Sequence, residues 1–99
     1  MASLKLSSPD ERSLVIEQDI DEATESVTLV VESEPRARFR RRFYTRDTVR
    51  VSDLPPGVKN VIVKQTQFDG EKSTTKFAAV KPGGKQHKAT ADEFREAQQ

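Results

Sequence analysis

The side chains best suited to chemistry are the arginines that recur between residues 36 and 50, interleaved with aromatic residues. In a β-strand successive side chains point to opposite faces, so every second residue lies on the same side. One side of a strand over residues 36–45, with its continuation, carries Arg36, Arg38, Arg40, Arg42, Tyr44 and Arg46. The other side carries Ala37, Phe39 and Phe43, which is typical of a core-facing surface. The pattern predicts a half-buried strand whose outer side is a candidate partner-binding surface.

Three uses of this outer side fit its composition. The arginines could pair with carboxylates of the same protein and blunt an edge strand against aggregation. They could instead bind carboxylates of a partner protein or of another copy through two-pronged guanidinium contacts. In the third use they follow the phosphates of a nucleic acid while Tyr44 stacks on a base. Arg41 is turned to the apolar side, so we expect it at the sheet rim or beside a buried carboxylate, with Glu17 and Glu32 as candidates.

Residues that catalyse reactions or bind metals are scarce elsewhere. The chain has no cysteine and a single histidine, His87, in a Gly/Lys-rich stretch, so no nucleophilic or acid-base constellation is indicated. The acidic residues 19–25 lack the spacing of a calcium loop, and residues 82–85 lack the first glycine and following helix of a phosphate loop. We therefore expect no enzyme activity, no cofactor and no metal site.

Composition and charge limit the fold and its partners. The chain has 99 residues, which fits one domain, and its apolar and charged fractions are both 33%, so we expect a thin core and an ionised surface. Residues 1–35 hold nine acidic against two basic groups, a net charge of −7, and residues 36–99 have a net charge of +8. Either oppositely charged strands pair within the sheets, or two surfaces of opposite sign meet partners or other copies.

The positioning elements are predicted to be strands. Apolar residues alternate with polar ones up to about residue 81, and turn-forming residues recur at roughly ten-residue intervals. The predicted strands cover residues 3–7, 13–19, 26–32, 36–45, 48–53, 60–68 and 73–80. Alternation assigns to the core Val27, Leu29, Val31, Val49, Val51, Val61 and Val63, with Gln65 following on the same side. The pattern favours an all-β sandwich of two sheets, with a hairpin at Asp69-Gly70.

The C-terminal segment differs in composition from the rest. Residues 83–88 are rich in glycine and lysine, and the residues from Thr90 to Glu93 have the spacing of a capping box that opens a short helix over residues 90–98. Phe94 is the one large apolar residue of that helix, which would be marginal alone in water. We expect a β-sandwich domain over residues 1–82 and a flexible tail over residues 83–99, unless Phe94 docks on the body or on a partner.

The stretch from Thr48 to Lys64, with a leucine before a Pro-Gly corner at Leu54 to Gly57, resembles part of the fibronectin type III and related immunoglobulin-like domains. It is similar to their E strand, corner and F strand, and Asp69-Gly70 matches the hairpin that follows. The resemblance covers residues 48–80 and implies an immunoglobulin-like sandwich of about seven strands that serves as a binding or spacer module. The corner tyrosine of the family would fall at Asn60, and the chain has no tryptophan.

These observations together predict a non-enzymatic protein-protein interaction or assembly module that binds a protein partner or another copy. Nucleic-acid binding by the same strand is the alternative. A small sandwich without cysteine suits an accessory structural component of a bacterial or phage assembly such as a virion. The sequence has no basic segment followed by a long apolar run, so we expect no secretion signal, no membrane span, and a cytoplasmic or virion location.

Overall fold

The computed structural model describes residues 4–18, 24–45, 47–68 and 70–98. Predictions that involve Asp69, Arg46 or the acidic residues at 19–22 therefore lie outside the described residues. Within the described part, no helix has the length and apolar character that crossing a membrane requires.

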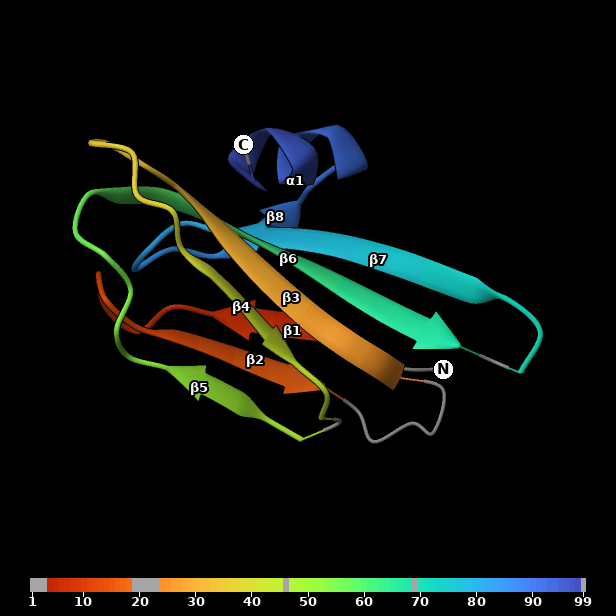
Figure 1. The fold of residues 1–99 in the computed structure, drawn as a ribbon. Helices are drawn as coiled ribbons and strands as arrows, with labels where there is room; N and C mark the ends of the chain where they lie inside the picture. Colours follow the sequence, from red (N-terminus) through yellow and green to blue (C-terminus); the bar gives the residue numbers. More distant parts are fainter. Residues whose placement is uncertain (1–3, 19–23, 46, 69, 99) are drawn as a thin grey trace.

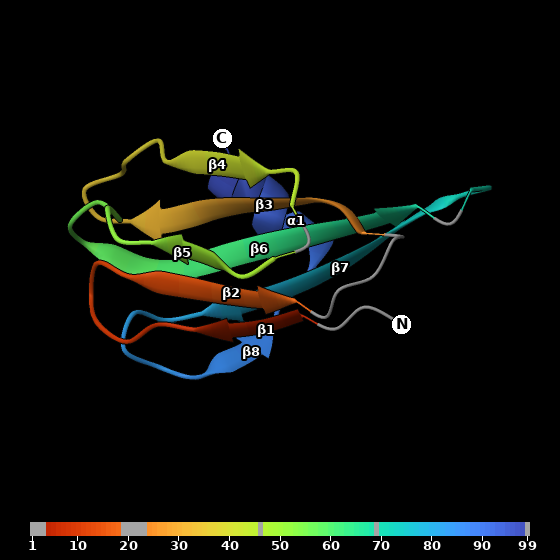
Figure 2. The ribbon, with the colours of Figure 1, turned by 90° about the horizontal axis from the view of Figure 1, so that it is seen from below.

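The chain forms two antiparallel sheets, so the prediction of a mostly β, two-sheet protein is confirmed (Figure 1). The three-stranded sheet has the order β1-β2-β5 and consists of β1 (Leu4–Ser7), β2 (Leu14–Gln18) and β5 (Val49–Val51). The five-stranded sheet has the order β4-β3-β6-β7-β8 and consists of β3 (Thr24–Ser33), β4 (Arg40–Phe43), β6 (Val58–Phe68), β7 (Ser73–Val80) and β8 (Gln86–Lys88). Figure 2 shows β4 and β8 at opposite edges of the larger sheet.

The main core lies between the two sheets. The alternating residues assigned to the core from the sequence are buried there: Val27, Leu29, Val31, Val49, Val51, Val61 and Val63. Gln65 is also fully buried, and its amide nitrogen donates to Oε1 of Gln18 on β2 at 2.8 Å. Gln18 in turn donates to the carbonyl oxygens of Thr45 and Asp47, so the buried Gln65 amide belongs to a chain of hydrogen bonds that crosses from one sheet to the other.

The arginine-rich strand is shorter than the sequence predicts. Alternation predicted a strand over residues 36–45, whereas β4 pairs with β3 only from Val27↔Phe43 to Val30↔Arg40. Pro35 has no backbone donor, and the backbone N–H of Ala37 donates to the Ser33 hydroxyl at 2.8 Å rather than to a neighbouring strand. Residues 34–39 therefore run outside the sheet before β4 begins.

A second, smaller core lies on the opposite face of the five-stranded sheet. Helix α1 (Ala91–Gln98) covers that face (Figure 1), and Phe94 is buried there against Val30, Ile62 and Ala79. The ring of Phe94 also meets the ring of Phe77 at 5.7 Å between centroids. The molecule thus has three layers, in the order helix, five-stranded sheet, three-stranded sheet.

The segment after residue 82 belongs to these layers. β8 pairs with β7, and the Gln86 side chain bonds the β1 backbone at both the Leu6 N–H and the Leu4 carbonyl oxygen. Thr90 caps the start of the helix, since the Glu93 N–H donates to the Thr90 hydroxyl at 3.1 Å and that hydroxyl donates to the Glu93 carboxylate at 3.3 Å. The sequence predicted a flexible tail unless Phe94 docks on the body or on a partner. In the structure Phe94 packs against the body of the same chain.

The first prediction concerns this docking. Replacing Phe94 with alanine should lower the free energy of unfolding by about 3 kcal/mol, because it removes a buried aromatic ring and leaves a cavity under the helix. Urea unfolding measures the change. Glu96→Ala, an exposed change on the same helix, is the control and should alter stability by less than about 0.5 kcal/mol. Equal stability of both variants would contradict the second core.

The corner between β5 and β6 is held by hydrogen bonds from two other loops. Leu54 is fully buried, its N–H donates to the carbonyl oxygen of Arg12 at 3.1 Å, and the Arg12 guanidinium Nε donates back to the Leu54 carbonyl. Gly57 has φ 77°, and its carbonyl oxygen accepts the Glu34 N–H at 2.9 Å. A Cβ at Gly57 would lie 2.2 Å from the Glu34 carbonyl oxygen, so this position requires glycine for both its conformation and its close approach.

The second prediction separates these two requirements. Gly57→Ala should destabilise the fold by more than about 2 kcal/mol, because the left-handed backbone penalty of roughly 1 to 2 kcal/mol adds to a backbone clash. Gly83→Ala is the matched control, since Gly83 has φ 72° but open space around its Cβ position. Thermal unfolding of the two variants should differ clearly. Equal losses of stability in the two variants would show that the close approach of the Glu34 carbonyl to residue 57 adds no destabilisation of its own.

Candidate functional site

The outer arginines lie on the helix side of the five-stranded sheet. Arg40 is the register partner of Val30 and Arg42 that of Thr28, and directly opposed residues share a face, here the face that α1 covers. Arg36 and Arg38 precede the strand and line hollows beside Ala97 of the helix. We call the four exposed side chains Arg36, Arg38, Arg40 and Arg42 the arginine face.

The arginine face is not neutralised by the described part of the protein. None of its four guanidinium groups forms an ion pair among the described residues. Arg36 shares a hollow with Glu32 and Glu96, so the charge is most concentrated at Arg38, Arg40 and Arg42. Three exposed cations on one surface, with no ion pair among the described residues, give a local positive potential in a chain whose net charge is only +1.

Tyr44 ends this row. Its side chain is 73% exposed, and the Arg42 guanidinium carbon lies 5.2 Å from its ring centroid. The pair presents an aromatic surface next to a cation, and both remain open to solvent. Arg46, the sixth residue of the predicted surface, lies outside the described residues.

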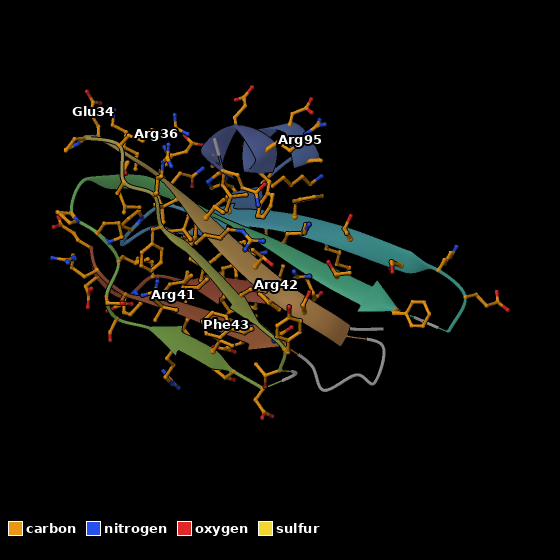
Figure 3. The ribbon with its side chains drawn as sticks, viewed as in Figure 1. Glu34, Arg36, Arg41, Arg42, Phe43 and Arg95 are labelled. Atoms are coloured by element: carbon orange, nitrogen blue, oxygen red, sulfur yellow. The ribbon has the colours of Figure 1, made fainter. Side chains whose placement is uncertain are left out.

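Arg41 does not contact either of the carboxylates proposed for it. It sits at the sheet rim, which is one of the two predicted positions. Its Nη2 bonds Oδ2 of Asp53 at 2.6 Å, and both side chains are exposed. Its guanidinium also lies 4.3 Å above the Phe39 ring. Figure 3 shows Arg41 and Arg42 on opposite sides of β4. The inward Arg41 pairs with Asp53, whereas the outward Arg42 forms no ion pair among the described residues. Alternation could not show that the β5–β6 corner brings Asp53 to this edge.

Glu17 and Glu32, the predicted partners, are placed elsewhere by the register. Glu17 lies opposite Lys5 in the three-stranded sheet, and Glu32 lies opposite Asn60 on the helix side. A pair that does join the acidic and basic parts of the sequence is Glu34–Lys59, with 2.5 Å between Oε2 and Nζ. The hydrogen bond and the charge of Lys59 lower the pKa of Glu34 below its ordinary value of 4.5.

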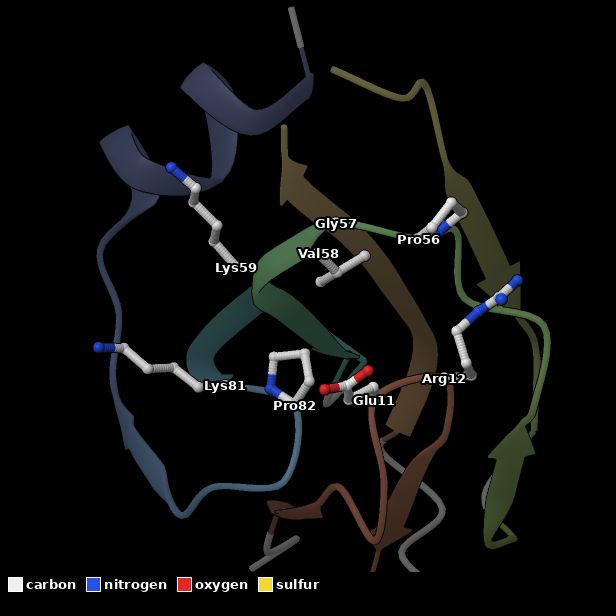
Figure 4. Close-up of a pocket in the computed structure, with 8 residues that line it drawn as sticks. All are labelled: Glu11, Arg12, Pro56, Gly57, Val58, Lys59, Lys81 and Pro82. Atoms are coloured by element: carbon white, nitrogen blue, oxygen red, sulfur yellow. The ribbon is translucent and has the colours of Figure 1, made fainter. Parts of the chain in front are cut away.

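A separate hollow, lined by none of the arginine-face residues, lies at the end of the sandwich. It has a volume of about 550 Å³ between the β1–β2 turn, the β5–β6 corner and the start of the β7–β8 turn. Figure 4 shows the ammonium groups of Lys59 and Lys81 directed away from Arg12, with Glu11 and Pro82 between them. Lys59 is moreover paired with Glu34. The cations of this hollow do not converge, so it offers no anion-binding arrangement.

No family model matches the sequence, and no curated protein matches it.

His87, the one histidine, lies on β8 with Nε2 at 3.2 Å from Oδ1 of Asn60. In the described part of the chain, no three His, Asp or Glu side chains lie close enough together to hold a metal ion. The arginine face with Tyr44 is therefore the arrangement on which a functional argument can be built.

The third prediction concerns the Glu34–Lys59 pair. Because the folded-state pKa of Glu34 is lowered, its contribution to stability is present above pH 4.5 and is lost as the pH falls through the folded-state value. Lys59→Gln should raise the pKa of Glu34 toward 4.5, as measured by carboxyl-carbon NMR titration. Lys81→Gln, which removes a cation from the same hollow, should leave that titration unchanged. A Glu34 titration that is identical in wild type and Lys59→Gln would refute the assignment.

Proposed function

We propose that the protein is a non-enzymatic interaction or assembly module that binds an acidic surface of a protein partner through the arginine face. The observation that carries the proposal is the exposed row of Arg38, Arg40 and Arg42, which forms no ion pair within the described residues. Guanidinium groups bind carboxylates through paired, directional hydrogen bonds, and arginine is enriched in protein interfaces. A surface of this kind gains both orientation and association rate from an acidic partner.

Nucleic-acid binding is the alternative that a specific observation favours. Tyr44 is exposed beside Arg42, which is the arrangement that stacks on a base while a phosphate is bound. The carboxylates of Glu32 and Glu96 at the other end of the row would repel a long polyanion, however. The short extent of the unpaired cations therefore favours a protein partner.

We also propose that the sandwich is of the immunoglobulin-like type. In that fold the A, B and E strands share one sheet and the C, F and G strands share the other. The chain order here supports this, since β1, β2 and β5 form one sheet while β3, β6 and β7 are neighbours in the other. The order of β5 and β6, with the buried Leu54 between them, is the order expected of the E and F strands and also supports the proposal. β8 and α1 are additions to that arrangement. Membership in a virion or another assembly stays a prediction from the sequence.

The fourth prediction tests the binding face with two charge-matched variants. Arg38→Gln/Arg40→Gln/Arg42→Gln removes three cations from the face, and Lys5→Gln/Arg50→Gln/Lys85→Gln removes three exposed cations from other surfaces. A fluorescein-labelled, glutamate-rich peptide should bind the first variant about tenfold more weakly than wild type, because three exposed ion pairs of about 0.5 kcal/mol each together contribute about 1.5 kcal/mol. Binding to the second variant should change by less than about twofold. Fluorescence anisotropy at low salt provides the measurement.

The same assay includes the alternative. Equal losses in both variants, or no binding of the peptide by wild type, would overturn the proposal. A single-stranded oligonucleotide of the same charge that binds more tightly than the peptide, and loses affinity on Tyr44→Ala, would assign the face to nucleic acid.

A further inference from the structure

A groove runs between the last turn of α1 and the segment that leads into β4. It has a volume of about 340 Å³, within the range of small ligand sites. Its lining includes Val30 on the sheet, Ala37 and Phe39 on the incoming segment, and Ala97 on the helix. Arg38 and Arg40 are also part of the lining. The groove therefore lies within the arginine face and combines apolar walls with two cations.

The origin of the groove is the early end of the β3–β4 pairing. β3 continues to Ser33, but its pairing with β4 stops at Val30↔Arg40, and residues 34–39 leave the sheet (Figure 1). Neither residues 34–39 nor the described part of α1 fills the space above Val30. Ala37 and Ala97 have small side chains, and both are only partly buried. The groove is thus bounded by residues 34–39 on one side and by α1 on the other.

We infer that this groove anchors one apolar side chain of the acidic partner segment, whose flanking carboxylates bind Arg38 and Arg40. The inference rests on the proposed function and specifies its partner: an acidic peptide segment with an apolar residue between its carboxylates. Charge complementarity selects the carboxylates, because the two arginines form no ion pair in the described part of the chain. The apolar walls select the central side chain, since an interface gains most where an apolar anchor fills a pocket surrounded by polar contacts.

A phosphate backbone fits this groove less well. Phosphates would satisfy the arginines but would leave the surfaces of Ala37 and Ala97 without an apolar partner. An acidic segment without an apolar residue would make the same incomplete contact. The groove therefore discriminates between ligands of equal charge, which the arginine face alone does not do.

The test compares two fluorescein-labelled peptides that are rich in glutamate and identical except for a central phenylalanine or alanine. The phenylalanine peptide should bind wild-type protein about five- to tenfold more tightly, as expected for burial of part of an aromatic side chain. Ala97→Phe fills the groove from the helix and should reduce this advantage to less than about twofold, while affinity for the alanine peptide stays within about twofold of wild type. Ala91→Phe, the same change at an exposed position of the same helix, should keep the full advantage.

A second variant, Ala37→Leu, fills the groove from the opposite wall and gives an independent result if Ala97→Phe perturbs the helix. Circular dichroism and thermal unfolding identify any variant that does not fold. Equal binding of the two peptides by wild type would overturn the inference and leave the proposed function standing. If wild type binds neither peptide, the inference and the proposed function are both overturned. A phenylalanine advantage that survives both groove variants would place the anchor elsewhere and also overturn the inference. The inference is likewise overturned if the two variants weaken the binding of an oligonucleotide but not that of either peptide.

Discussion

The structure depends on the burial of both faces of the central strands β3 and β6. Val30 and Ile62 point to one side of the sheet, while their neighbours Leu29 and Val63 point to the other, and all four are almost completely buried. A sheet with two apolar faces must be covered on both. The three-stranded sheet covers one face, and the C-terminal helix with Phe94 covers the other. An eight-residue helix, too short to be stable alone, is held because it completes this second cover.

The same constraint determines where charge can lie. With the middle of the five-stranded sheet covered on both sides, arginines are accommodated at the edge formed by β4. An edge strand rich in cations also resists pairing with a second copy of itself, because like charges would be brought together. The inward Arg41 is compensated by Asp53 and the Phe39 ring. The outward arginines form no ion pair among the described residues and lie next to the helix that the second core requires.

The ends of the sandwich are fixed by polar contacts between segments far apart in the sequence. Gln86 bonds the backbone of β1, Gln18 bonds the carbonyl groups of Thr45 and Asp47, and Arg12 bonds the Leu54 carbonyl. Each contact satisfies backbone groups that the two separate sheets leave without a ladder partner. These contacts close the sandwich where pairing between strands stops.

The sequence by itself determined the features that arise from local periodicity. Alternation located the strands and the inner core at Val27, Leu29 and Val61, and the Thr90 capping box located the helix, because these signals depend only on near neighbours. The sequence also contained a second signal, which the alternation of apolar and polar residues does not reveal. The unbroken apolar runs Leu29–Val31, Val61–Val63 and Ala78–Val80 indicate strands buried on both faces and hence a second cover.

The tertiary structure alone decided which distant residues meet. It paired Arg41 with Asp53 in place of Glu17 or Glu32, shortened the arginine strand to β4, and added Gln86–Lys88 to the sheet as β8. The exposed side of the segment that carries Arg36, Arg38, Arg40 and Arg42 was predictable from their spacing, but the groove beside Ala97 was not. The reason is physical. Spacing along the chain fixes the side of a strand on which a residue lies, whereas the packing of all the layers decides which residues of other elements face that side.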